Sequence, residues 1–360
     1  MVQVRYLELK QFRCFSQLSL TFNEQMVLIC GQNGSGKTSI LEALHYLCYL
    51  HSFRETSPRH LIHFGQESFF LKVNLEDMFR QDTEIQVGFS AGKRLVKVNK
   101  SPVYSYKDLI DYYRVITVTE DDLQLVKGGP ERRRSFLDQA LILYDPDFIH
   151  VLRKYKQILE NRNRLLQQPF SDKLSFELWT QQLWEKAKII QQNRTNVLAS
   201  LVKHTNQLIQ DYFNQELSFD FIYQPKRACD QESIDKFLVA NKTIFENEWR
   251  YGRSLFGAHL DDFAIEFQQK KSKIYASRGQ QKLALLLLKI AQLQELKACK
   301  GGGLLLLDDF MNDFDKSRGK LLIEIIAGLN CQAIFASPLQ NSFFEQLLLK
   351  RGVQNIELKA

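Results

Sequence analysis

The chain has 360 residues, of which 44% are hydrophobic and 25% are charged, which is ordinary for a globular protein and excludes a disordered one. Its formal charge of +7 is compatible with an acidic partner such as nucleic acid, but it is also common in proteins that bind none. The six cysteines form no C-x-x-C pair, which disfavours a zinc site or a disulfide framework. No signal-peptide pattern opens the chain, and its longest apolar run, 283–288, is far shorter than a bilayer span, so we predict a cytoplasmic protein.

The first third of the chain is predicted to be rich in strands. Residues 2–22 alternate between apolar and polar side chains as two strands with a turn at 12–15, and 25–30 indicates a short buried strand. From 38 to 50 the apolar residues recur at helical spacing. Further strands are expected at 69–75, 84–89, 94–98 and 115–118.

A phosphate-binding loop lies between the strand at 25–30 and the helix at 38–50. The segment matches the pattern G-x-x-x-x-G-K-[ST] at every fixed position, and the strand before it and the helix after it disfavour an accidental glycine-rich turn. Its glycines let backbone N–H groups approach the phosphates of ATP, Lys37 adds a positive charge, and Thr38 is expected to bind Mg²⁺. The predicted ATP-binding residues here are Gly31, Gln32, Asn33, Gly34, Ser35, Gly36, Lys37 and Thr38.

Two long amphipathic helices are predicted in the middle of the chain, at 147–168 and 176–213. Joined near Pro169–Asp172, they would form an antiparallel helical arm. Its basic residues could follow a phosphate backbone, although a charged outer face is the usual condition of such an arm and is favoured for each residue singly. These residues are Arg153, Lys154, Lys156, Arg162, Arg164, Lys186, Lys188 and Arg194.

A second nucleotide-related block follows a predicted strand at 217–223 and an amphipathic helix at 234–249. Ser277, Gly279 and Gln280 stand at the start of an apolar helix that runs to about 297, an arrangement suited to an anion. The apolar strand 304–307 then ends in Asp308 and Asp309, the form of a Walker B segment. Helix 317–327, strand 332–336, helix 343–349 and strand 353–357 are expected to complete an α/β sheet.

Together these motifs form the signature set of an ABC-type ATPase. In that architecture, the Ser-Gly-Gln turn at Ser277 caps the γ-phosphate of ATP bound to a second copy of the chain, so an ATP-dependent homodimer is expected. Asp308 would hold Mg²⁺ through water. Lys37 and Asp309 are the predicted catalytic residues, with Asp309 orienting the attacking water. Because Asp309 replaces the longer Glu of fast ABC ATPases, slow turnover is expected.

Motif spacing distinguishes among the ABC subfamilies. About 240 residues separate Lys37 from Ser277, whereas a transporter ATPase would place only on the order of one hundred there. The predicted fold is therefore an α/β ABC-type phosphate-loop ATPase head, similar to SMC and RecF proteins, with an inserted helical arm too short for an SMC rod. We predict three parts: 1–120 with the loop and a β lobe, 121–250 as the arm, and 251–360 with the signature and Walker B segments.

Several passages resemble the RecF family of recombination mediators, from one end of the chain to the other. The resemblance implies a weak, DNA-stimulated ATPase of DNA replication, recombinational repair and the SOS response. It also implies binding to single-stranded and gapped DNA and loading of RecA with RecO and RecR. The passages are Phe12-Arg13, Lys37 to Ala43, Ser52-Phe53-Arg54, Asp122-Leu123, Val126 to Gly128, Pro130 to Asp138, Asn161-Arg162-Asn163, Ser277 to Lys282 and Leu306 to Asp309.

The sequence departs from the family pattern in one passage. The family's Gly-Pro-His-Arg-Asp-Asp is here 257–262, in which Ala258 and Leu260 replace the proline and the arginine. Contacts carried by that arginine are therefore in doubt, and His259 is open to a purely structural role. A different function also stays open, namely a nucleotide-switched interaction protein whose arm docks a protein partner. A small-molecule phosphotransferase is disfavoured, because such an enzyme has no use for the signature segment.

Overall fold

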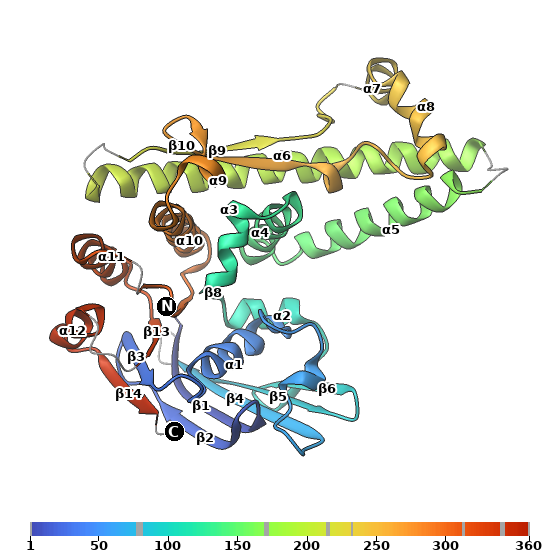
Figure 1. Cartoon of the computed structure of the whole chain (residues 1–360). Coiled ribbons are helices and arrows are strands. Elements are labelled where there is room, and N and C mark those ends of the chain that lie inside the picture. Colours follow the sequence, from blue (N-terminus) through green and yellow to red (C-terminus); the bar gives the residue numbers. More distant parts are fainter. Residues whose placement is uncertain are drawn as a thin grey trace. The chain divides into compact units, whose positions relative to one another are not determined.

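The structure is a computed structural model that describes residues 2–76, 82–168, 173–213, 217–231, 233–311, 314–338 and 343–358 (Figure 1). Its contacts divide the chain into two compact units. Unit 1 comprises Met1–Leu123 and Leu286–Ala360, and unit 2 comprises Gln124–Leu285. The chain therefore leaves unit 1 once and returns to it once.

Unit 1 contains an antiparallel sheet with the strand order β2-β1-β4-β5-β6-β7. Buried and half-buried side chains alternate along β4 and β5, because one face of the sheet packs on the core. The predicted strands at 2–22 and in the β lobe are thereby confirmed. The strands are β1 Gln3–Phe12, β2 Phe15–Thr21, β4 Ser68–Glu76, β5 Asp82–Ser90, β6 Lys93–Val98 and β7 Ser101–Val103.

The second sheet of unit 1 is parallel, with the order β14-β3-β13-β12-β8. The four leucines of β12 are all buried, as expected for a strand covered on both faces. Because the strands are parallel, the loop after β3 and the acids at the end of β12 reach the same edge of the sheet. The strands are β3 Met26–Gly31, β8 Val115–Val118, β12 Leu304–Asp308, β13 Ala333–Pro338 and β14 Gln354–Leu358.

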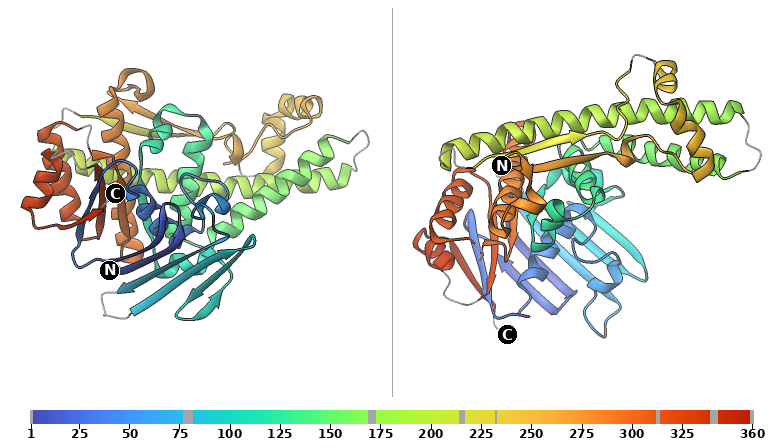
Figure 2. Two further views of the ribbon diagram at one scale, coloured as in Figure 1. Left: turned by 60° about the horizontal axis from the view of Figure 1, so that its bottom comes forward. Right: turned by 45° about the horizontal axis from the view of Figure 1, so that its top comes forward.

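Helix α1, Lys37–Tyr49, lies between these two sheets, since it contacts β1, β4 and β5 of one and β3, β8, β12 and β13 of the other (Figure 2). Nearly all of its side chains are buried, because strands of both sheets contact it. Its buried Glu42 is paired with Arg13, at 2.7 Å. Other helices of unit 1 are η1 Pro58–Leu61, α2 Tyr106–Tyr112, η2 Glu120–Leu123, α11 Lys316–Gly328 and α12 Phe343–Lys350.

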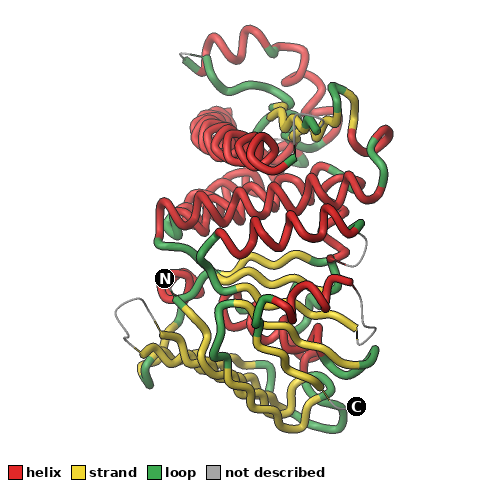
Figure 3. Tube along the Cα trace, turned by 90° about the vertical axis from the view of Figure 1, so that its left-hand side faces the viewer, coloured by secondary structure: helices red, strands yellow, loops and turns green. Residues whose placement is uncertain are grey.

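Unit 2 is mainly helical, and its long helices are drawn red in Figure 3. Helices α5, Phe148–Leu166, and α6, Lys173–Tyr212, pack against each other, so the two predicted arm helices are confirmed. The predicted junction at 169–172 lies outside the described residues. Two helices precede α5, namely α3 Gln124–Lys127 and α4 Pro130–Tyr144. The hydrophobic core of unit 2 includes Leu141, Phe148, Tyr155, Ile158, Leu183, Trp184, Ala187, Ile190, Phe237 and Phe256.

The rest of unit 2 corrects one prediction. The prediction of a single helix at 234–249 is wrong. The structure has two helices there, α7, Ile234–Ala240, and α8, Lys242–Tyr251, which are separated at Asn241. The side chain of Asn241 donates to the carbonyl of Phe237 at 2.9 Å, a local bond that competes with the helix. The other elements are β9 Phe219–Gln224, η3 Ala258–Leu260, β10 Asp262–Phe267, β11 Lys270–Lys271, α9 Ser272–Tyr275 and α10 Arg278–Lys300.

The division at 120/121 and 250/251 stays a prediction. By its contacts, the stretch 251–285 groups with the arm, because β10 pairs with β9 over its whole length and also packs on α4. Helix α10 continues from unit 2 into unit 1.

Across the described ranges, no helix has the length and apolar character needed to cross a bilayer.

Candidate nucleotide-binding site

The loop between β3 and α1 has a backbone that only glycine tolerates at several positions. Gly34 and Gly36 have φ angles of +87° and +95°, in the left-handed region. A Cβ atom at Gly31 would contact Ser35 Oγ and lie 3.1 Å from the carbonyl oxygen of Leu358. A Cβ atom at Gly36 would collide with the ring of Phe15. The three glycines are therefore required by the tight turn that brings the backbone to α1.

Lys37 braces this loop from inside. Its Nζ donates to the carbonyl oxygens of Gly31 and Gln32, at 2.9 and 3.0 Å, and the side chain is buried. A lysine ammonium has three N–H donors, so one remains for a ligand. The charge is thus held in place before any phosphate arrives.

Thr38 and Asp308 meet at the carboxyl edge of the parallel sheet. Thr38 Oγ1 donates to Asp308 Oδ1 at 2.9 Å. Burial raises the pKa of Asp308 to about 6, a shift opposed by this hydrogen bond and increased by the charge of Asp309. A cation beside these two oxygens would offset the cost of the buried carboxylate, and hydroxyl and carboxylate oxygens are the ligands that Mg²⁺ prefers.

A cavity of about 530 Å³ opens over the loop. It is lined by Asn33, Gly34, Gly36, Lys37, Thr38 and Asp309, so the structure brings most of the predicted residues of the phosphate loop together with one of the two acids. Its size is within the range of small-molecule sites. Beside it, the hydroxyl oxygen of Ser35 is buried and makes no hydrogen bond within the described residues. The residues present therefore fit a bound nucleoside triphosphate and Mg²⁺.

Arg54 also lines this cavity, and residue types alone did not assign it a role. Its backbone N–H donates to Ser52 Oγ at 2.8 Å, while its exposed guanidinium makes no hydrogen bond or ion pair with any residue that the structure describes. Its charge lowers the pKa of Asp308, so it acts on the same place as Lys37. In the sequence, Arg54 was noted only because the passage Ser52-Phe53-Arg54 resembles the RecF family. That resemblance did not assign a chemical role to the arginine.

The signature segment begins α10 with a reciprocal cap. The amide of Gln280 donates to Ser277 Oγ at 3.3 Å, and the amide of Ser277 donates to Gln280 Oε1 at 2.7 Å. Ser277 is exposed, and its hydroxyl accepts in this cap, so its own hydrogen can be donated to an anion. Ser277, Gly279 and Gln280 belong to unit 2, whereas the phosphate loop and both acids belong to unit 1.

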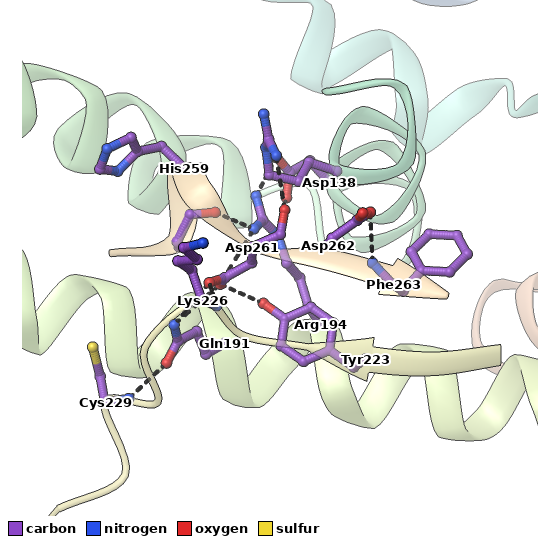
Figure 4. Close-up of polar contacts among 12 residues, drawn as sticks. Asp138, Gln191, Arg194, Tyr223, Lys226, Cys229, His259, Asp261, Asp262 and Phe263 are labelled. Atoms are coloured by element: carbon purple, nitrogen blue, oxygen red, sulfur yellow. Dashed lines mark hydrogen bonds and ion pairs between the residues drawn. The ribbon is translucent and has the colours of Figure 1, made fainter. Parts of the chain in front are cut away.

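Two of the eight arm residues considered for DNA prove to be buried, which corrects their placement on an outer face. Arg194 contacts both carboxylate oxygens of Asp138, at 2.8 and 2.9 Å, and the carbonyl of Ala258 at 2.7 Å (Figure 4). Beside it, Asp261 accepts hydrogen bonds from the Tyr223 hydroxyl at 2.7 Å and from Gln191 Nε2 at 3.1 Å. Arg194 is thus part of the packing of unit 2.

Arg162 is the other buried arginine. It is fully buried and contacts Glu248 at 2.5 Å, Thr180 at 2.9 Å and Ser254 at 2.7 Å. Its guanidinium also lies over the ring of Phe176, 4.7 Å from the centroid. A guanidinium with no exposed surface cannot contact a phosphate backbone.

The divergent passage at 257–262 is also held by contacts within unit 2. Arg133 pairs with Asp262 at 2.6 and 2.9 Å, and Arg134 donates to the carbonyl of Asp261 at 2.7 Å. The hydroxyl of Tyr155 accepts from the amide of His259 at 3.1 Å and lies 2.8 Å from its Nδ1, so its hydrogen is directed to that nitrogen. Burial lowers the pKa of His259 to about 4, consistent with a neutral imidazole packed in the structure.

Comparison with known proteins agrees with this architecture. The family model for the RecF/RecN/SMC N terminal domain matches residues 3–356. An SMC head domain from Pyrococcus furiosus has the same fold, with a TM-score of 0.57 at 16% identity over 96% of this chain and 92% of that one. Together, the fold, the glycine loop and the paired acids define an ABC-type ATPase head of the RecF and SMC class.

The match to one branch of this class is closer. A DNA replication and repair protein RecF from Ruminiclostridium cellulolyticum is 32% identical over 90% of both chains, and one from Leptospira interrogans is 29% identical over 93% of this chain and 91% of its own. A solved structure of the recombination mediator protein RecF with ATP, in the RecFOR pathway, has a TM-score of 0.84 at 25% identity and covers 95% of this chain and 93% of that one. This chain belongs to the RecF family, so the predicted fold class and family are confirmed.

Proposed function

We propose that this chain is an ATP-gated DNA-binding protein of DNA replication and recombinational repair, with weak ATPase activity. The observation that carries the proposal is the Thr38–Asp308 pair beside the braced Lys37, at the edge of a cavity over the glycine loop. The names of the relatives, DNA replication and repair protein RecF, support the cellular role.

In this proposal, each residue at the cavity has one task. The loop amides and Lys37 bind the phosphates of ATP, and Arg54 adds a second positive charge. Thr38 and Asp308 hold Mg²⁺, which supplies charge neutralisation at the phosphates when it is bound. Asp309 orients the attacking water. Because its carboxylate is one methylene shorter than that of Glu, we expect turnover to be slow.

We further propose that ATP joins two copies of the chain. Ser277, Gly279 and Gln280 would complete the site on the partner, with the Ser277 hydroxyl and the start of α10 facing the γ-phosphate. The exposure of Ser277 and the cap formed with Gln280 support this role. Ser277→Arg is expected to leave ATP affinity unchanged and to abolish ATP-dependent dimers in sedimentation. Dimers formed by this variant with ATP would exclude the shared site.

The proposed macromolecular partners are single-stranded and gapped DNA, with RecO and RecR assisting in loading RecA. The positive charge of the chain supports DNA as a partner. RecO, RecR and RecA rest on the family resemblance and on the RecFOR pathway named for a similar structure.

The decisive experiment measures binding to a gapped duplex with and without ATP. We expect ATP to tighten binding in the parent protein and to have no effect in Lys37→Ala. The affinity should fall steeply between about 50 and 200 mM salt, because phosphate contacts release counterions. A DNA affinity that depends on neither ATP nor salt concentration would contradict the proposal that DNA is the partner.

A second candidate function has its own observation. Apolar side chains are exposed at the start of α6 and along α7 and α8, among them Leu174, Val239 and Tyr251. Such side chains would suit a nucleotide-switched arm that docks a protein. The same gapped-duplex measurement discriminates, since a protein-docking arm predicts no ATP-dependent DNA affinity.

A further inference from the structure

Phe64 is an aromatic residue that the proposed function does not use. Its side chain is 96% exposed, yet it lines the same cavity as Lys37, Thr38 and Asp309. An exposed phenylalanine alone needs no explanation. An exposed phenylalanine at the border of the proposed nucleotide cavity, however, has the bound nucleotide as a candidate ligand.

The backbone that carries Phe64 is fixed to the turn between β1 and β2. The amide of Arg13 donates to the carbonyl of Leu61 at 2.8 Å, and the amide of His63 donates to that of Gln11 at 2.8 Å. The ring of His63 bonds the carbonyl of Arg13 at 2.7 Å, and Phe12 and Ile62 form a β-bridge. This segment is therefore anchored on both sides of Ile62, and the ring of Phe64 is presented from a fixed position.

The residues that line the cavity include two groups of different chemistry. The glycine loop, Lys37 and Arg54 offer amides and positive charge, which suit phosphates. Ile62 and Phe64 offer apolar surface, which phosphates do not use. The remaining part of a nucleoside triphosphate that needs such a surface is its base, and bases stack on aromatic rings.

We propose that Phe64 is the platform on which the base of the bound nucleotide stacks, with Ile62 beside it. This inference rests on the proposed ATP site and adds a residue that binds the other end of the ligand. Because every base has a π-face, the ring contributes affinity rather than a strict choice of base. A purine, with the larger ring system, should gain more from it than a pyrimidine.

The experiment compares ATP with inorganic tripolyphosphate, which has the phosphates but no base. Affinities are measured by calorimetry at protein concentrations where sedimentation shows monomers. Phe64→Ala should weaken ATP binding about tenfold, the scale of one stacked base, and leave tripolyphosphate unchanged. Phe64→Trp should restore the ATP affinity. Tyr104→Ala is the matched control, because Tyr104 is 93% exposed in the same unit but does not line the cavity.

Each other outcome overturns the proposal. Equal ATP affinity in Phe64→Ala and the parent protein excludes stacking, and an equal loss for both ligands means that the ring supports the phosphate loop instead. A loss of ATP-dependent dimers with unchanged ATP affinity would place Phe64 at an interface between copies. A parent protein that does not bind ATP would instead contradict the proposed function itself, so the two failures are distinguishable.

Discussion

The nucleotide cavity of unit 1 and the polar centre of unit 2, formed by Arg162, Arg194 and their partners, both use positively charged side chains, and they differ in whether these side chains can reach a ligand. In unit 2, Arg194 bonds both oxygens of Asp138 and a carbonyl, and Arg162 bonds three side chains. At the cavity, Lys37 keeps one donor, and the guanidinium of Arg54 has no partner among the described residues. Residue type thus does not separate binding from structure, whereas access to the cavity does, because Lys37 and Arg54 line it and Arg162 and Arg194 do not.

The comparison also reduces the number of basic arm residues that remain candidates for the proposed contact with DNA. Arg162 and Arg194 are buried, and Lys188 donates to the carbonyl of Gln231 at 3.0 Å. Of the basic residues considered on the arm, four are exposed: Arg153, Lys154, Lys156 and Arg164. These four all lie on α5, so α5 is the helix on which charge variants should first be tested for DNA affinity.

The largest effect is expected from breaking the buried pair in unit 2. Arg162→Ala should destabilise this unit by about 3–5 kcal/mol, because it leaves the carboxylate of Glu248 buried without a counter-charge. Urea unfolding followed by tryptophan fluorescence measures this effect specifically, since all three tryptophans, Trp179, Trp184 and Trp249, lie in unit 2.

The matched control for that variant is Arg164→Ala, an exposed arginine on the same helix, which should change stability by less than about 0.5 kcal/mol. The double variant Arg162→Met with Glu248→Leu should recover most of the stability that Arg162→Ala loses, because both charges of the pair are then removed. Equal stability of Arg162→Ala and Arg164→Ala would contradict a structural role for the buried pair.

At the cavity, the corresponding change removes function rather than stability. Lys37→Ala should weaken ATP binding at least about 100-fold, since it removes both the free donor and the brace on the carbonyls of Gly31 and Gln32. Calorimetric titration with ATP gives the affinity, and urea unfolding followed by circular dichroism, which reports on both units, should stay unchanged. Retained ATP affinity would show that the phosphates do not reach this loop.

The sequence predicted the cavity better than it predicted the polar centre of unit 2. The glycine loop and the acids after β12 are local patterns, and a parallel sheet brings such patterns to one edge, so Thr38 and Asp308 meet as expected. The pairs Arg162–Glu248 and Arg194–Asp138 join residues far apart in the chain, and no helical periodicity distinguishes them from exposed basic residues. Arg54 and Phe64 reach the cavity from a loop without a regular pattern, which is why spacing could not assign them.

A smaller effect is expected from protonation in unit 2. The pKa of His259 is lowered to about 4, so between pH 6.5 and 4 the unfolded chain binds a proton that the folded one does not, and stability falls as the pH falls. We expect about 1–2 kcal/mol to be lost between pH 8 and pH 5, measured by tryptophan fluorescence in urea. His259→Gln should lose less over the same range. An equal loss in both proteins would assign the pH dependence to other groups.

The smallest effect is expected on ATP affinity in a variant of Arg54. The same measurement distinguishes the role of Arg54 from that of Phe64. Arg54→Ala should weaken ATP binding about fivefold at low salt, since an exposed charge near a phosphate contributes on the order of 1 kcal/mol, and the difference should shrink as salt is added. Arg59→Ala, which removes an exposed arginine that does not line the cavity, is the control. Tripolyphosphate should lose as much affinity as ATP, because Arg54 acts on the phosphates. If Arg54→Ala lowers the affinity for ATP but not for tripolyphosphate, Arg54 contacts the base. That result would contradict the assignment of Arg54 to the phosphates and of Phe64 to the base.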